Sequence, residues 1–498
     1  MIVTNPVFRV DMPDPDVIRI NDVYYMVSTT MFFMPGGMIL KSKDLVNWDP
    51  CSYIFETIES SDIYELKNGK NAYGKGQWAT SLTYHKGLFY ACFVCHDLGK
   101  TFIYYTDDIE KSGWDRYVID DAFHDMSFLF VDNVPYLIYG NGSIYAVELK
   151  EDLSGVKPGG LHKIILETPK EHMHLCCEGC RAYVKNGYIY LSFIDVPDEV
   201  AGNDQRRQVC YRSKNLEGPY ERKIILDDDF SLNKRGVAQG PFIEDENGNW
   251  YAMLFQDRGS CGRMPFLMPL SWVDDWPVPN LLASFETQFE GKQNNETSFI
   301  VSDSFNHTKN ELNICWQWNH NPINEGWSFT ERPGYLRLTN KQVANDLLTA
   351  RNTLTQRTIE PGCSFTVEMD ASGLNDGDYA GLTAFMSQYG QVGICKEDGE
   401  LKIKYVRRDK EGILHTENES CESQNIYLMV KFDYKNLTDK AYFYISFDGT
   451  DWKQIGDILN MEYTLDLFVG YRIGIFMYGS KMTDGHADFK NFEYHHNF

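Results

Sequence analysis

The segment KNGYIYLSF (residues 185–193) is a polar turn followed by an aromatic strand, and the chain contains this pattern five times. The other copies are INDVYYMVS (20–28), HKGLFYACF (85–93), VDNVPYLIY (131–139) and ENGNWYAML (246–254). Successive turns lie 46 to 65 residues apart, which is enough for a four-stranded sheet with its loops. No segment has a long apolar pattern of period 3.6, so the repeats are predicted to be sheets. Radial packing of five such sheets is a β-propeller.

A second set of positions keeps a nearly constant distance from these turns. Eight or nine residues before each turn, a polar or aromatic residue opens the preceding strand. Equivalent positions on the blades of a propeller lie on a ring around the central axis, so we expect these side chains to converge at one end of it. The five residues are Asp14, Trp78, Asp125, Glu178 and Gln239.

Three of these five residues are carboxylic acids. Like charges at close range raise the pKa of at least one carboxyl group, so such a site holds one acid protonated and another ionised near neutral pH. Cleavage of a glycosidic bond with one acid and one base needs that pair. Turn acids or calcium ligands are the alternative interpretation of the same residues.

The composition limits the kinds of partner. The chain has 498 residues and a formal charge of −24, from 47 Lys and Arg against 71 Asp and Glu. That sign disfavours nucleic acid and anionic membrane surfaces. The N-terminal segment does not resemble a secretory signal, and no apolar run approaches the roughly 18 residues of a membrane helix. We therefore expect a cytoplasmic protein that binds neither nucleic acid nor membrane.

Twelve cysteines are scattered along the chain, and we interpret them as reduced thiols. Cys92, Cys95 and His96 form the C-x-x-C-H pattern of haem attachment, but they lie in an aromatic run that is typical of a buried strand. The cluster at 176–180 is not followed by the second Cys/His pair of a structural zinc site. Neither cluster predicts a cofactor.

Six segments in order carry a family resemblance: NPVFRVDMPDPDVIR (5–19), FFMPGGMILKSKDLVNW (32–48), QWATSLTYHKGLFY (77–90), HDMSFLF (124–130), EGCRAYVKNGYIYL (178–191) and QGPFIEDENGNWYAMLFQDRGSCGRMP (239–265). Together they resemble glycoside hydrolase family 43. The resemblance implies a five-bladed β-propeller enzyme that inverts configuration, commonly a β-xylosidase, an α-L-arabinofuranosidase or an arabinanase.

The resemblance also implies roles for three acids of this sequence. Asp14 in PDP matches the general base, and Glu178 in EG matches the general acid. Asp125 in HD matches the acidic residue that orients and tunes the general acid. These are the three acids that the turn spacing places on one ring.

The same resemblance implies a set of substrate-binding residues. Arg263 matches a sugar-contacting arginine, and Trp78 and Phe33 match aromatic positions that line the pocket. Gln239 would help to hold a terminal pentose. It stands where many members have a histidine that in some of them holds a central metal ion, which argues against an axial calcium here.

The second half of the chain differs in pattern from the first. A polar stretch, ETQFEGKQNNETS (286–298), is followed by strands of alternating polarity with Asp-Gly turns, which predict an antiparallel β-sandwich. Three segments, WQWNHNP (316–322), TERPGYLRL (330–338) and ARNTLTQRT (350–358), are similar to the concanavalin-like C-terminal domain of family 43 β-xylosidases. We therefore expect an all-β chain with a catalytic propeller over 1–285, a linker over 286–299 and a sandwich over 300–498.

The sandwich carries three further expectations. Trp316 and Trp318 are two residues apart on one strand and share a face, which favours a place in the core over a carbohydrate-binding surface. In family members this domain packs on the propeller and walls the pocket, which favours an exo-acting enzyme. A structural calcium shared by Asp303 and Asp488 is left open.

Together these observations predict an inverting exo-glycoside hydrolase that needs no organic cofactor. Its expected substrates are arabinoxylan-type or xylo-oligosaccharides ending in α-L-arabinofuranose or β-D-xylose, and the choice between the two pentoses is left open, as is the oligomeric state. The alternatives are an endo-acting arabinanase-type hydrolase and a non-catalytic sugar-binding propeller. A retaining fructosidase-like propeller is disfavoured because the sequence has neither a WMNDPNG-type opening nor an RDP segment.

Overall fold

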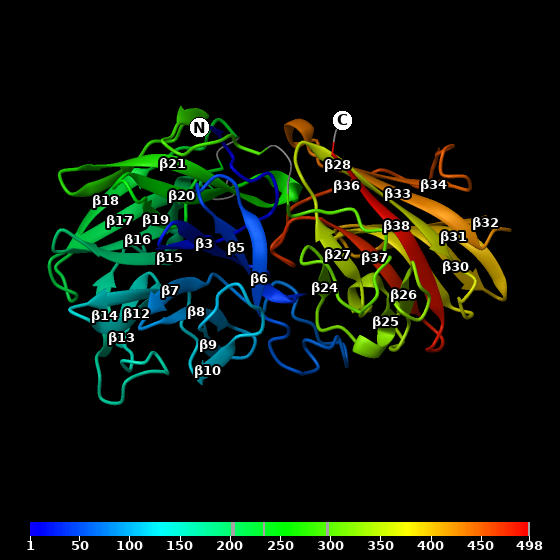
Figure 1. The fold of residues 1–498 in the computed structure, drawn as a ribbon, viewed down its shortest axis with the longest axis horizontal. Coiled ribbons are helices and arrows are strands. Elements are labelled where there is room, and N and C mark those ends of the chain that lie inside the picture. Colours follow the sequence, from blue (N-terminus) through cyan, green and yellow to red (C-terminus); the bar gives the residue numbers. More distant parts are fainter. Residues whose placement is uncertain (201–204, 233–234, 295–297, 497–498) are drawn as a thin grey trace.

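The computed structural model describes residues 1–200, 205–232, 235–294 and 298–496. A propeller, coloured blue to green, lies beside a sandwich, coloured mostly yellow-green to red (Figure 1). Within these residues, the only helices are short 3-10 turns, and none is long or apolar enough to cross a membrane. The turns are η1 (Asp198–Val200), η2 (Gly259–Cys261), η3 (Asn324–Gly326), η4 (Leu347–Thr349) and η5 (Lys435–Leu437). The all-β prediction is confirmed.

Five four-stranded antiparallel sheets form the propeller. The first strands β2, β7, β11 and β15 contact one another in succession, and β19 contacts β2, so the sheets close around an axis. The predicted five-bladed arrangement is confirmed. The blades are β2 (Asp16–Ile20), β3 (Val23–Ser28), β5 (Gly36–Ser42), β6 (Asp49–Phe55); β7 (Ser81–His85), β8 (Leu88–Cys95), β9 (Lys100–Thr106), β10 (Asp115–Ile119); β11 (Ser127–Val131), β12 (Val134–Asn141), β13 (Ser143–Glu148), β14 (His162–Glu167); β15 (Met173–Lys185), β16 (Tyr188–Pro197), β17 (Arg207–Ser213), β18 (Glu221–Leu226); and β19 (Phe242–Glu244), β20 (Trp250–Asp257), β21 (Arg263–Val273), β22 (Trp276–Pro279).

The five aromatic repeats are the second strands of the blades, β3, β8, β12, β16 and β20. Most of these strands are buried on both faces, because each blade packs against its two neighbours. This packing explains why the sequence shows apolar runs there rather than strict alternation. Cys92 and Cys95 lie fully buried on β8, as predicted, and all twelve cysteines are free thiols.

The two ends of the propeller sequence meet in one small sheet. β1 (Ile2–Thr4) pairs with β23 (Ser284–Glu286), and the amino group of Met1 donates hydrogen bonds to the carbonyls of Thr287 and Phe289. The predicted linker over 286–299 therefore starts inside β23 and runs beside the N-terminus, and its residues 295–297 lie outside the described residues. The exact domain boundaries remain predictions.

Two eight-stranded sheets face each other in the sandwich. The first has the order β32-β31-β30-β29-β37-β27-β24-β4, and the second has the order β25-β26-β38-β28-β33-β34-β35 with β36 beside β34. Trp316 and Trp318 are buried, as expected for core residues. The strands are β24 (Gln317–Asn319), β25 (Trp327–Ser328), β26 (Leu336–Thr339), β27 (Leu354–Arg357), β28 (Gly362–Asp370), β29 (Asp378–Phe385), β30 (Gly390–Glu397), β31 (Glu400–Arg408), β32 (Leu414–Ser420), β33 (Asn425–Asp433), β34 (Lys440–Ser446), β35 (Lys453–Gln454), β36 (Leu459–Asn460), β37 (Arg472–Gly479) and β38 (His486–His496).

One strand of the first sandwich sheet comes from the propeller sequence. β4 (Phe33–Met34) lies between β3 and β5 in the chain, yet it pairs with β24 of the sandwich. The ring of Phe33 has no exposed surface; it packs on Phe385, and the guanidinium carbon of Arg472 lies 3.6 Å from the ring centroid. The two units therefore share a continuous apolar core.

The contacts of Asp303 and Asp488 do not favour a shared calcium. Asp488 accepts hydrogen bonds from Arg337 Nε and from Arg332 Nη1, each at 2.7 Å. Asp303 Oδ1 lies 2.8 Å from the ring nitrogen Nε2 of His307. Each carboxylate is thus engaged by protein partners of its own.

Candidate active site

A cavity of about 430 Å³ receives at least one residue from each blade of the propeller. The five residues that recur at a constant distance from the turns all line it: Asp14, Trp78, Asp125, Glu178 and Gln239. Four of them precede the first strand of their blade by two or three residues, and Glu178 lies within β15. The structure thus brings together all five positions that the turn spacing selects.

The backbone is strained at three of these positions. Asp14, Asp125 and Gln239 have φ angles of 53°, 46° and 66°, in the left-handed region that non-glycine residues avoid. Such conformations cost about 1–3 kcal/mol each and persist where the surrounding structure holds them, typically at functional sites. The same strain at equivalent points of three blades marks this end of the axis.

Asp14 is paired with a buried cation. Nη1 of Arg263 donates to both carboxylate oxygens of Asp14, at 3.1 and 3.4 Å, and only 2% of Arg263 is exposed. The arginine neutralises the carboxylate while leaving it as an acceptor for further donors. This arrangement suits a group that must take a proton from water.

Glu178 has a different set of partners. Its Oε2 accepts a hydrogen bond from Nδ2 of Asn141 at 2.6 Å and lies 3.0 Å from Nε2 of His124. The other ring nitrogen of His124, Nδ1, lies 2.9 Å from Nε2 of His96. Glu178 therefore contacts a titratable histidine, whereas Asp14 contacts an arginine, so the two carboxylates of one cavity have different partners.

Asp125 lies next to this histidine and is the most buried of the site's acids. Burial raises the pKa of Asp125 to about 6, and the charges of Glu178 and Asp14 raise it as well, against the opposing charge of His124. The expectation that at least one of the three acids has a raised pKa is therefore met by Asp125. Its Oδ2 also accepts a hydrogen bond from the backbone nitrogen of Gly179, which ties it to the strand of Glu178.

Four buried polar atoms on residues that line the cavity have no hydrogen-bond partner among the described residues. They are Nε1 of Trp78, Oδ1 of Asp125, Nη1 of Arg206 and Nε of Arg263. Buried polar groups are normally satisfied, so three orphaned donors and one acceptor around one cavity indicate a polar ligand with hydroxyl groups. The indole ring of Trp78, which lines the same cavity, adds a surface on which a sugar ring can stack.

The sandwich closes one side of the cavity. The loop between β36 and β37 contributes Leu465 and Phe468 to its lining. The ring of Phe468 lies 4.4 Å from the guanidinium carbon of Arg263 and 5.8 Å from the ring of Trp78. Its carbonyl also accepts a hydrogen bond from Nη2 of Arg263 at 3.2 Å. The expected wall from the second domain is therefore present.

Models of known families match both parts of the chain. Residues 3–277 match the glycosyl hydrolases family 43, and residues 302–495 match the β-xylosidase C-terminal concanavalin A-like domain. The chain belongs to glycosyl hydrolase family 43. It is therefore a glycoside hydrolase, and the cavity on its propeller is the candidate active site.

Individual relatives agree with the family 43 assignment. A β-xylosidase of Formosa agariphila is 26% identical over 98% of this chain and 90% of its own length. A non-reducing end α-L-arabinofuranosidase of Bacteroides ovatus is 26% identical over 67% of this chain and 64% of its own.

Two solved structures share the whole family 43 architecture. A bifunctional GH43-CE protein of Bacteroides eggerthii is 40% identical, with a TM-score of 0.93; it covers all of this chain, which spans 64% of that protein. An engineered GH43 glycoside hydrolase described as displaying both endo-xylanase and exo-arabinofuranosidase activity is 26% identical over the full length of both chains, with a TM-score of 0.87.

One predicted pocket residue of the family 43 site lies elsewhere. Phe33 does not line the cavity, because β4 carries it into the sandwich sheet, where it is fully buried. The expectation that Phe33 contacts the sugar is therefore wrong. An aromatic ring that does line the cavity comes from the other domain: Phe468, which covers the guanidinium group of Arg263.

Several lining residues of the family 43 cavity were not anticipated from the sequence. His124 directly precedes Asp125 in the HD segment, and this adjacency was the one available signal for it. Asn141 ends β12, at the same end of its blade as Asp125. Five further lining residues come from the long strands β15 and β16 and from the position just before β17: His174, Leu175, Ile194, Val196 and Arg206.

One cluster of the described residues brings three metal-ligand types together. Atoms of His124, Asp125 and Glu178 lie within 4.8 Å of one another. The hydrogen bond between His124 and Glu178 and the 3.7 Å contact between His124 and Asp125 account for this geometry without an ion. We therefore treat the cluster as acid–base machinery.

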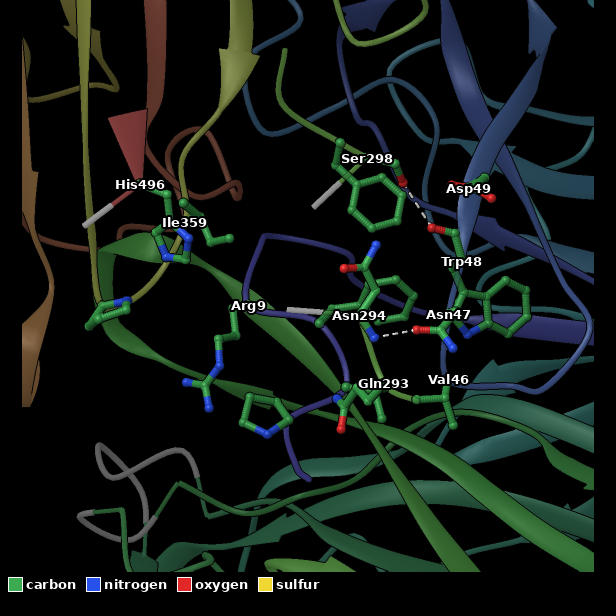
Figure 2. A pocket seen from close by; sticks show the side chains of 15 residues that line it. Arg9, Val46, Asn47, Trp48, Asp49, Gln293, Asn294, Ser298, Ile359 and His496 are labelled. Carbon is green, nitrogen blue, oxygen red and sulfur yellow. Dashed lines mark hydrogen bonds between the residues drawn. The ribbon is translucent and has the colours of Figure 1, made fainter. Parts of the chain in front are cut away.

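A second cavity, of about 300 Å³, lies where the propeller meets the sandwich (Figure 2). Its wall includes Arg9, Trp48 and His496, and it is bordered by a hydrogen bond from the Asn294 backbone nitrogen to Asn47 Oδ1 at 2.6 Å. None of the three ring acids lines it. The catalytic residues of a glycosidase are therefore assigned to the cavity on the propeller axis.

Proposed function

We propose that this chain is an inverting exo-glycoside hydrolase that releases terminal α-L-arabinofuranose or β-D-xylose from oligosaccharides derived from arabinoxylan or xylan. The observation that carries this proposal is the different partner of each of two carboxylates in one cavity. Asp14 is held by a buried arginine, which keeps its protons, whereas Glu178 is held by an amide and by a histidine, which can give a proton up. Asp14 is therefore suited to act as a base and Glu178 as an acid.

The proposed reaction divides the work between these two residues. Asp14 takes a proton from a water molecule that attacks the anomeric carbon, while Glu178 protonates the leaving oxygen. In inverting enzymes the two carboxyl groups are roughly 6.5–9.5 Å apart, which leaves room for the water. Asp125 keeps Glu178 oriented through the Gly179 backbone, and the unpaired donors of Trp78 and Arg263 bind sugar hydroxyl groups.

The shape of the cavity supports attack at chain ends. Phe468 and Leu465 of the sandwich block one side, which an internal segment of a polysaccharide would have to pass. The names of the relatives agree with this proposal, since they include a β-xylosidase and a non-reducing end α-L-arabinofuranosidase. The chemistry uses only side chains and water, so the proposal includes no organic cofactor.

The decisive experiment measures activity and stereochemistry together. The purified chain is assayed on nitrophenyl β-D-xyloside and nitrophenyl α-L-arabinofuranoside, and the first sugar released is followed by NMR. We expect hydrolysis of at least one substrate with the inverted anomer appearing first, and no activity in the Asp14→Asn variant. Initial release of the retained anomer would overturn the inverting mechanism. Initial cleavage of xylopentaose into xylobiose and xylotriose, before xylose and xylotetraose appear, would overturn the exo assignment.

A further inference from the structure

Three side chains from three elements form a hydrogen-bonded row that ends at Glu178. His96 follows β8, His124 precedes β11, and Glu178 lies on β15. Nε2 of His124 is 3.0 Å from Glu178 Oε2, and Nδ1 of the same ring is 2.9 Å from His96 Nε2. Both nitrogens of His124 are therefore engaged, one toward the acid of the cavity and one toward a second, exposed histidine.

The charges around His124 are unequal on its two sides. Asp125 Oδ2 lies 3.7 Å and Glu178 Oε2 lies 3.0 Å from Nε2, whereas His96 faces Nδ1. Burial lowers the pKa of His124, but the charges of Asp125 and Glu178 outweigh it and raise the pKa to about 9. Burial lowers the pKa of His96, the charge of His124 lowers it further, and the neighbouring Asp97 opposes both. A protonated His124 therefore lies between carboxylates and a neutral imidazole that accepts its Nδ1–H.

We propose that the acid of this site is a two-residue unit, in which His124 stores the proton that Glu178 delivers and His96 holds the charged ring in place. The proposal rests on the assignment of Glu178 as the general acid. His124 and His96 act through Glu178, so they are positioning residues for the acid step.

The proton balance of one turnover follows from this arrangement. In the resting site His124 carries a proton on both ring nitrogens and Glu178 is a carboxylate. As the glycosidic bond breaks, the Nε2 proton of His124 moves to Glu178, and Glu178 passes a proton to the leaving oxygen, which departs as a neutral hydroxyl. His124 is left neutral with its proton on Nδ1, and Asp14 holds the proton of the attacking water. Once the products leave, Nε2 takes a proton from water and Asp14 returns one to water.

The first test is spectroscopic and does not depend on activity. The full chain is labelled with ¹⁵N-histidine, and the ring signals are followed against pH; loss of a signal in His124→Gln assigns it. We expect His124 to be doubly protonated at pH 7 and to titrate near pH 9. Glu178→Gln removes one negative charge and should move that titration down by a pH unit or more. The control His162→Gln, a histidine bonded to Tyr139, should leave it unchanged.

Variants of His96 test the outer end of the row. His96→Leu removes the acceptor of the His124 Nδ1–H and should lower the pKa of His124. His96→Gln offers an amide oxygen as the acceptor and should restore most of that pKa. A His124 ring that is neutral at pH 7 in the wild-type chain would overturn the proposal.

The second test is the pH profile of kcat/KM. In the wild-type chain the alkaline limb of the profile should follow the deprotonation of His124. In His124→Gln this limb should move to lower pH. The loss of kcat/KM in His124→Gln should be at least tenfold larger on an oligosaccharide than on a nitrophenyl glycoside. An alkaline limb that stays in place in His124→Gln would overturn the proton-storing role. A wild-type chain inactive on both pentosides would instead overturn the proposed function, and the NMR result would still decide the state of His124.

Discussion

Phe468 of the sandwich covers Arg263 of the propeller and also accepts a hydrogen bond from it. Its ring lies 4.4 Å from the guanidinium carbon, and its carbonyl accepts from Nη2 at 3.2 Å. Asp11 links the two segments that carry these residues. One of its carboxylate oxygens accepts a hydrogen bond from the Arg263 backbone nitrogen, and the other accepts one from the backbone nitrogen of Gly470, two residues after Phe468. The cation that pairs with Asp14 is thus positioned by both domains.

Truncation of this wall should affect substrate binding more than folding. Phe468→Ala removes the ring that covers Arg263 and is expected to lower kcat/KM on pentosides by about 10- to 100-fold, a loss of about 1.4–2.7 kcal/mol of transition-state binding. Steady-state kinetics and a melting curve measure the two effects. Leu414→Ala, on an exposed strand of the same domain, is the control. An unchanged kcat/KM would remove Phe468 from the site.

The two principal carboxylates should respond differently to the leaving group. Asp14→Asn should abolish hydrolysis of all substrates, because no other group activates the water. Glu178→Gln should lower activity on oligosaccharides by about 10²–10⁴-fold, the usual contribution of a general acid, and should spare dinitrophenyl glycosides, which leave without protonation. The ratio of the rate on an oligosaccharide to the rate on a dinitrophenyl glycoside, measured for each variant, shows how far hydrolysis depends on protonation of the leaving group. Equal losses on both substrates in Glu178→Gln would contradict its role.

Asp125 should make stability depend on pH. Its pKa is raised from 3.8 to about 6, so the folded state holds its proton more tightly than the unfolded state does. The contribution of Asp125 to the free energy of unfolding is therefore largest below about pH 4. This contribution is lost as the pH rises to about 6 and above. Asp125→Asn removes the charge and tolerates the left-handed backbone, so it should raise the stability at pH 8 by up to about 3 kcal/mol.

Thermal unfolding of Asp125→Asn at pH 4.5 and pH 8 checks this sign. The gain in melting temperature should be larger at pH 8, and activity should fall because Glu178 loses its charged neighbour. Asp120→Asn, at an exposed position, is the control. A gain of equal size at both pH values would contradict the raised pKa.

Phe33→Ala should act on stability rather than on catalysis. The ring is fully buried between the two units, and loss of a buried phenylalanine costs about 3–5 kcal/mol. Chemical denaturation should therefore show a large loss, while KM on nitrophenyl pentosides stays within about twofold. The exposed Phe447 provides the matched control, Phe447→Ala. A stable variant with a much higher KM would place Phe33 in the pocket after all.

Removal of divalent cations should leave the activity unchanged. The His124–Asp125–Glu178 cluster is held by its own hydrogen bond and ionic contact, so the proposed chemistry needs no ion. Dialysis against EDTA followed by a pentosidase assay checks this. A loss that calcium restores would show that an ion belongs to the site.

The propeller and the ring of five residues could be predicted from the sequence because both depend on local spacing. A turn and the strand around it are adjacent in the chain, and the blades repeat them in order, so Asp14, Trp78, Asp125, Glu178 and Gln239 follow from one register. Their chemistry, a carboxylate pair with a third acid beside it, follows from residue type.

The residues that the prediction missed depend on contacts between distant parts of the chain. Phe468 is 205 residues from Arg263, in a loop without periodicity, and only the packing of the two domains brings them together. Phe33 leaves its own sheet for a strand that lies more than 280 residues further along the chain. His124 differs from these residues, because it is adjacent to Asp125 in the sequence and could have been predicted from that adjacency.

The pairing of β4 with β24 has a consequence for dissection of this enzyme. A propeller expressed without the sandwich would carry Phe33 and an unpaired strand edge on its surface, and a sandwich without the propeller would lose its terminal strand. Exposed apolar edges of this kind promote aggregation. The two halves should therefore melt in a single transition, and exchange of one half between relatives requires that β4 travels with the sandwich whose edge it completes.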